Sequence, residues 1–160
     1  MRAYHVTPTQ NVESILQSGL VPQVGDRGER FRETAPLVFF IPDLKTTFYE
    51  INDWLLDEIK MDTGNSDITI LEVDLLGYDI GGTSRVNGVV NFQREVAVSD
   101  HVGADRIISV MTMRDLAERL WRERSFKPSD TYLSLLGNEH LREIYDRSFE
   151  HPTRVFGVPF

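Results

Sequence analysis

The longest uninterrupted apolar run in this sequence is Leu37–Ile41, far shorter than the ~20 residues that a membrane-spanning helix needs. The chain must therefore build its core from short elements, each burying one or two faces. The N-terminal residues 1–10 contain no apolar stretch of the kind found in a secretory signal. These features predict a cytoplasmic protein with no membrane partner.

The length of 160 residues corresponds to about one domain, and 41% hydrophobic with 26% charged residues is typical of a globular chain. The sequence has no cysteine, which excludes disulfides, thiolate zinc sites and cysteine nucleophiles. His101 and His140 have no partners at metal-ligand spacing, so we predict no metal site. The net charge of −8 disfavours non-specific binding of nucleic acid.

Period-two patterns predict short strands. In Arg2–Val6, Tyr4 and Val6 point to one face and His5 to the other, outward face. The remaining predicted strands are Pro36–Ile41, Ile68–Leu75, Gly88–Phe92, Arg94–Ser99 and Arg106–Met111.

Helix signals lie between and after these strands. Thr7 and Gln10 predict a capping box with Pro8 as the first helical residue, and Gly19 predicts the end of that helix. Asp43 predicts the N-cap of a helix whose buried stripe is Phe48, Ile51, Trp54, Leu55 and Ile59. Two later helices are predicted at Asp115–Arg124 and Glu139–Phe149.

Strands and helices that are partly segregated along the chain predict an α+β fold with small packed sheets. We place one domain at residues 1–111. Residues 112–160 form a helical extension that we expect to dock on the same domain.

Three polar side chains stand out on the predicted strands. Gln93 and Glu95 project from one face of a strand, away from Val96 and Val98. His5 projects from the opposite face to Tyr4. Each pattern has a simpler explanation, namely a solvated strand carboxylate for Glu95 and a histidine bonded to a backbone carbonyl for His5.

The order of these segments is more specific than any one of them. An N-terminal strand with His5 and Thr7 is followed by "ILQSGL", then "VFFIPD", and late in the chain "QREVAVSD" and "HVGADRIISV". In this order the chain resembles the ADP-ribosyltransferase superfamily, in its histidine–tyrosine–glutamate branch, over about residues 3–111. The resemblance implies a pair of small packed β-sheets with flanking helices, and NAD as co-substrate with no metal.

The resemblance also implies roles for the residues at the first two motifs. His5 would bond a ribose hydroxyl of NAD, and the backbone at Val6 and Thr7 would meet the nicotinamide carboxamide. Phe39 stands where the branch has tyrosine, so it keeps the ring and loses the hydroxyl. Phe48 or Tyr49 would supply the ring that stacks on nicotinamide.

Glu95 corresponds to the catalytic glutamate of the family. Gln93, two residues before it, corresponds to the position that helps to select the acceptor. The pyrophosphate of NAD needs cationic partners, and the candidates are Arg27, Arg30 and Arg32. The alternative is that these arginines are simply the solvated charges of a loop.

These implications favour a mono-ADP-ribosyltransferase, such as a toxin or effector, with an unknown protein, nucleic-acid or small-molecule acceptor. Two alternatives stay open. One is an RNA 2′-phosphotransferase on the same fold, and the other is an inactive module that binds NAD, ADP-ribose or a protein. Phe39 in place of tyrosine favours the inactive binding module.

Overall fold

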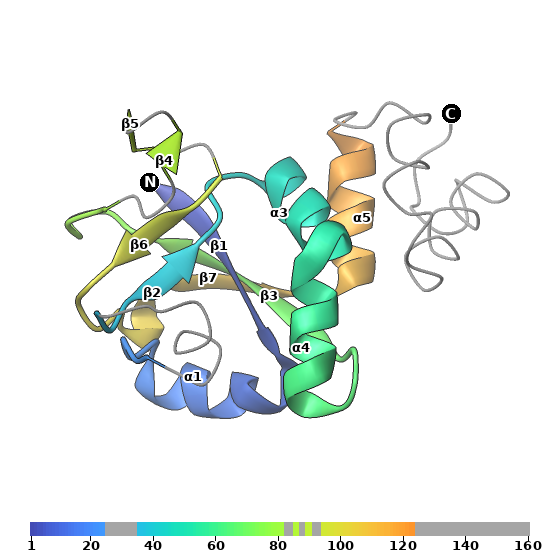
Figure 1. Ribbon diagram of the computed structural model, residues 1–160, viewed down its shortest axis with the longest axis horizontal. Coiled ribbons are helices and arrows are strands. Elements are labelled where there is room, and N and C mark those ends of the chain that lie inside the picture. The colour runs from blue at the N-terminus through green and yellow to red at the C-terminus, as the bar shows by residue number, and fades with distance from the viewer. Residues whose placement is uncertain (25–34, 82–84, 87–88, 91–93, 124–160) are drawn as a thin grey trace, which may run out of the picture.

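The computed structural model describes residues 1–24, 35–81, 85–86, 89–90 and 94–123. It is a small α+β fold with antiparallel sheets, as the sequence predicts (Figure 1). The first sheet has the order β1-β3-β7, formed by Arg2–Pro8, Ile68–Asp74 and Ile107–Met111. The second pairs β2 (Val38–Phe40) with β6 (Val96–Val98), and β4 (Arg85–Val86) pairs with β5 (Val89–Val90).

Both faces of the first sheet are covered. Three helices, α3 (Leu44–Glu50), α4 (Leu56–Thr63) and α5 (Met113–Arg122), pack on the face that carries Tyr4 and Val6. The second sheet packs on the opposite face, against Ala3, Leu71 and Val73. Figure 1 shows the three helices grouped at one side of the molecule. The period-two alternation predicted for β1 is therefore confirmed, although the face of His5 looks towards β2 rather than outward.

Helix α1 (Val12–Ser18) closes the second core through Ile15, and it ends at Gly19 as predicted. Gly19 has a φ of +81°, and a Cβ there would lie 2.3 Å from the carbonyl oxygen of Val102. Leu20 and Val102 exchange two backbone hydrogen bonds at this point. A residue with a side chain would break this close approach of the two segments.

The predicted start of the first helix is wrong. Thr7 and Pro8 belong to β1, where they pair with Thr69 and Ile68 of β3. A 3₁₀ turn at Thr9–Asn11 follows, and the α-helix starts only at Val12. Pairing with β3 overrides the local capping signal, because each ladder bond satisfies a backbone group that the cap would leave to a side chain.

The second helical region is interrupted. Asp43 caps α3 as predicted, since its Oδ1 accepts a hydrogen bond from the Thr46 amide at 2.8 Å. A π-helical segment, Ile51–Leu55, then separates α3 from α4. This segment brings Trp54 to a half-buried position. The prediction that Trp54 belongs to the buried stripe is therefore wrong in part, since the side chain packs against the core but stays partly exposed.

Other predicted bounds differ by a few residues. The sequence analysis did not predict β4, and of the predicted strand Gly88–Phe92 the structure describes residues 89–90, which form β5. The helix predicted at 115 starts at Met113, where Thr112 and Asp115 form a reciprocal capping box. The helix predicted at 139–149 lies outside the described residues. Within the described part of the chain, no helix is long and apolar enough to cross a membrane.

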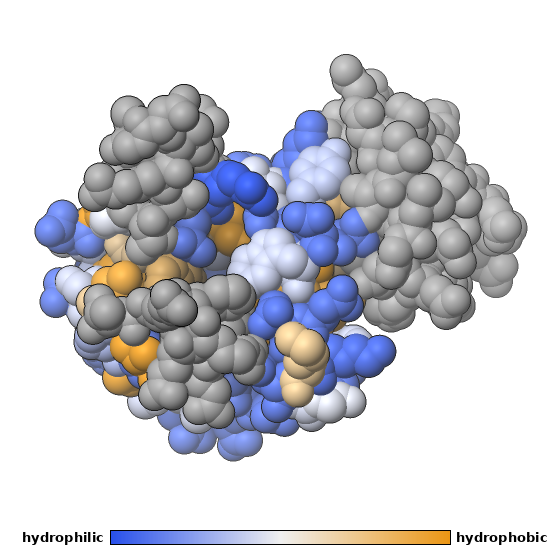
Figure 2. All heavy atoms as spheres, viewed as in Figure 1, coloured by the Kyte–Doolittle hydropathy of each residue, from blue (hydrophilic) through white to orange (hydrophobic). Residues whose placement is uncertain are grey.

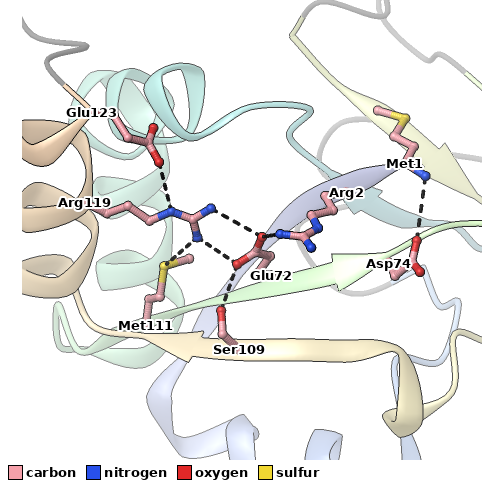
Figure 3. Close-up of polar contacts among 8 residues, drawn as sticks. All are labelled: Met1, Arg2, Glu72, Asp74, Ser109, Met111, Arg119 and Glu123. Atoms are coloured by element: carbon pink, nitrogen blue, oxygen red, sulfur yellow. Dashed lines mark hydrogen bonds and ion pairs between the residues drawn. The ribbon is translucent and has the colours of Figure 1, made fainter.

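A buried carboxylate fastens α5 to the first sheet (Figure 3). Glu72 of β3 is 3% exposed and accepts hydrogen bonds from Arg119 of α5 at 2.7 Å and from Ser109 of β7 at 3.0 Å. Arg2 of β1 adds a third donor at 3.3 Å. Four elements therefore meet at one side chain.

The partners of Glu72 determine its charge state. Burial alone raises the pKa of this carboxyl, but the hydrogen bonds from Arg119 and Ser109, with the charges of Arg119 and Arg2, bring the pKa below its ordinary 4.5. A pKa that is lower in the folded state stabilises the fold above the unfolded pKa. That stabilisation is lost as the pH falls below about 4.5 through the folded pKa of Glu72.

We expect Arg119→Met to lower the free energy of unfolding by about 3 kcal/mol at pH 7, because it leaves Glu72 buried without its main partner. The difference from the wild type should shrink below pH 4.5, where Glu72 takes up a proton. Urea unfolding across pH 3–7 measures both, with the exposed Arg114→Met as control. An equal loss of stability at every pH would contradict this account.

Candidate functional site

A single backbone contact joins the two sheets within the described residues, and the strands part next to it. Tyr4 of β1 and Ile41, which follows β2, exchange two hydrogen bonds of 2.8 Å. If this antiparallel ladder continued, Val6 would pair with Phe39. It does not continue, so β1 and β2 separate at this point.

His5 occupies the fork between the two strands. Its Nδ1 lies 2.9 Å from the carbonyl oxygen of Phe39, the acceptor that Val6 would otherwise use. Because a carbonyl can only accept, Nδ1 carries the proton, and the Nε2 of the neutral ring is an acceptor. The hydrogen bond to a backbone carbonyl that the sequence analysis left open for His5 is therefore present, and it fixes the tautomer.

The separation also exposes one edge of β1. Tyr4 directs its N–H and C=O towards Ile41, so strand alternation directs those of Val6 to the same edge, away from β3. Val6 makes no hydrogen bond along this edge with any of the described residues. Among the described residues, the amide donor and the carbonyl acceptor of Val6 thus lie side by side without a backbone partner on this edge.

A cavity of about 830 Å³ opens at this fork. It lies within the ~300–1,000 Å³ that is usual for small-molecule sites. Residues from β1, α1, β2, α3, α4 and the segment before β6 line it. Figure 2 shows mostly hydrophilic residues on the visible face, with smaller hydrophobic areas near β2 and β6.

Five of the residues predicted for the site line this one cavity. They are His5, Val6, Thr7, Phe39 and Glu95. They come from positions far apart in the sequence. Glu95 is half-buried and directly precedes β6, so it is not inside the strand as predicted.

The other predicted site residues are not brought to the cavity by the described structure. Phe48 is 2% exposed within the core, so its ring has no face for a ligand. Tyr49 is half-buried, stacks edge-on against Phe48 and does not line the cavity. Gln93, Arg27, Arg30 and Arg32 lie outside the described residues.

Among the cavity-lining residues that the sequence analysis did not predict are Glu50, Trp54 and Arg94, which bond to one another. Arg94 donates to Glu50 Oε1 from Nε at 2.8 Å and also from Nη2, and the Trp54 indole N–H donates to Oε2. The hydrogen bonds and the charge of Glu50 raise the pKa of Arg94. A glutamate inside an apolar helical stripe, four residues before a tryptophan, was the signal that could have found this cluster.

Within the described residues, no group of three or more His, Asp or Glu side chains is arranged to hold a metal ion. The charged and imidazole side chains that line the cavity are instead His5, Arg94 and three carboxylates, those of Glu50, Asp62 and Glu95, beside hydroxyl and amide side chains and the edge of β1. Such a set can bind hydroxyl and amide groups and stabilise positive charge. The chain matches no protein-family model and no curated protein.

We expect the amide of Val6 to exchange with solvent at least about tenfold faster than that of Tyr4, because only the latter has a backbone partner across the fork. Hydrogen-exchange NMR on the full chain measures the exchange rates of these two amides. The amides of His5 and Thr7, which face β3, serve as protected controls. Equal protection of Tyr4 and Val6 would mean that the edge of β1 is closed.

Proposed function

We propose that the protein is an NAD-dependent mono-ADP-ribosyltransferase, as the resemblance of its sequence implies, with the two-sheet fold of that superfamily. One observation carries the proposal. His5, Phe39 and Glu95, the positions matching the three family motifs, line a single cavity where two strands part.

The polar groups at the fork are complementary to the two parts of nicotinamide riboside. The Nε2 acceptor of His5 suits a ribose hydroxyl, which donates. The N–H and C=O of Val6, which bond to none of the described residues along this edge, suit a carboxamide, which accepts through its oxygen and donates through its nitrogen. A backbone contact leaves the side chain of Val6 in the core, which explains how valine is tolerated there.

Glu95 supplies the charge that the reaction needs. The bond between ribose C1′ and the nicotinamide nitrogen breaks, and its electron pair leaves with nicotinamide, which becomes neutral. Positive charge then develops on the ribose, and a nearby carboxylate stabilises it. The acceptor attacks C1′ and loses a proton, and water as acceptor gives ADP-ribose.

We expect Glu95→Gln to lower the rate of nicotinamide release by ~10²-fold or more while NAD affinity changes little, since the carboxylate acts on charge that develops only in the transition state. Glu13→Gln, an exposed glutamate of α1 outside the cavity, is the control. Loss of affinity with turnover retained would contradict the assignment.

The same assays separate the alternatives. Loss of the phosphate from a 2′-phosphorylated RNA end, with nicotinamide released only when this RNA is present, would identify a phosphotransferase that moves the phosphate to the ADP-ribose part of NAD. NAD binding without any turnover would identify a binding module. Mass spectrometry of protein, RNA and DNA fractions after incubation with labelled NAD identifies the acceptor.

We expect His5→Ala to weaken binding of a non-hydrolysable NAD analogue by about 1–3 kcal/mol, because one hydrogen bond to the ribose is lost. Calorimetry measures this, with a thermal melt to show that the variant is folded. His101→Ala is a matched control, since His101 also bonds a backbone carbonyl, that of Ser18, but lies outside the cavity. Equal affinities for wild type and His5→Ala would leave His5 a purely structural role.

A further inference from the structure

An ion pair beside Glu95, between the buried Glu50 and the exposed Arg94, has no part in the chemistry described so far. Glu50 is the last residue of α3 and is 8% exposed. One of its oxygens accepts both donors of Arg94, and the other accepts from Trp54. The carboxylate is therefore fixed through both oxygens.

This pair connects two parts of the cavity wall that no strand pairing connects. Glu50 belongs to the helical layer, whereas Arg94 stands directly before Glu95 and β6 in the second sheet. A fixed carboxylate fixes the planar guanidinium that bonds to it. The backbone at residue 94 is thereby held, and with it the position of the neighbouring Glu95.

The charges around the cavity give Arg94 a second effect. His5 of β1, Glu50 of α3, Asp62 of α4 and Glu95 line the cavity, and among the described lining residues Arg94 is the one lysine or arginine. Two carboxylates at one site raise each other's pKa, and a cation that acts on both lowers it. Glu50, Asp53 and Glu95 all act on the charge of Arg94.

We propose that Arg94, fixed by Glu50 and Trp54, is a positioning residue that holds Glu95 at the cavity wall and favours its ionised form. The kinetic consequence rests on the proposed function, whereas the ionisation of Glu95 does not. Because Arg94 acts through Glu95, its removal affects the chemical step more than the binding of NAD.

Arg94→Met removes the charge and keeps most of the aliphatic stem. We expect kcat for nicotinamide release to fall about tenfold or more, as misplacement of a reacting group does. KM for NAD should change less than about threefold, and the acid limb of the pH–rate profile should move up by about one pH unit. Arg94→Lys should restore the acid limb but only part of kcat, since lysine cannot form the paired hydrogen bonds.

Arg114→Met is the matched control, because its side chain is 61% exposed, against 58% for Arg94, and lies outside the cavity. Trp54→Phe keeps a ring but removes the donor that holds Glu50, and should lower kcat in the same direction. If Arg94→Met does not fold, Trp54→Phe tests the proposal in its place. Unchanged kcat in both Trp54→Phe and Arg94→Lys would overturn the proposal.

A ¹³C-carboxyl NMR titration of Glu95 in the full chain tests the ionisation without any turnover. We expect its midpoint to rise by about one pH unit in Arg94→Met. An absence of nicotinamide release in the wild type would defeat the proposed function while this titration still decides the role of Arg94. An unchanged midpoint overturns the proposal, as does a tenfold loss of NAD affinity with kcat intact, which would make Arg94 a direct anion contact.

Discussion

The pair of hydrogen bonds between Tyr4 and Ile41 is the constraint on which the site depends. It holds the two sheets together at one position, and the ladder stops immediately afterwards. A longer ladder would close the edge of β1. The imidazole of His5 keeps the fork open, because it takes the Phe39 carbonyl that would otherwise bond to Val6.

Two buried glutamates serve this arrangement in different ways. Glu72 lies 3% exposed among donors from β1, β7 and α5, and it fastens the helical layer to the first sheet. Glu50 faces the cavity and connects the helical layer to the segment before β6. Each carboxylate is paired with an arginine from a distant part of the chain, which offsets the cost of burying its charge. The helices thus fix both sides of the fork.

The fold was largely predictable where the pattern of buried residues is local. The alternation around Tyr4, the Asp43 cap and the stop at Gly19 need only a few neighbouring residues, and all three are confirmed. The capping signal fails as a guide at Thr7, because a strand partner that is distant in sequence takes its backbone groups. The same kind of signal at Thr112 and Asp115 is a real capping box, which the predicted start at residue 115 overlooked.

The site residues show the same difference between local patterns and contacts of distant segments. His5, Phe39 and Glu95 were predicted from the resemblance of the segments that carry them, and all three line the cavity. Glu50 and Arg94 were not, since they are 44 positions apart and their pairing depends on how α3 lies against the second sheet. The π-helical segment adds to this, because helical periodicity assigns Trp54 to the core, whereas the wider turn brings it to the cavity wall. A pattern within the sequence can therefore indicate which groups face a site, but the contacts that hold those groups in place arise only from the packing of distant elements.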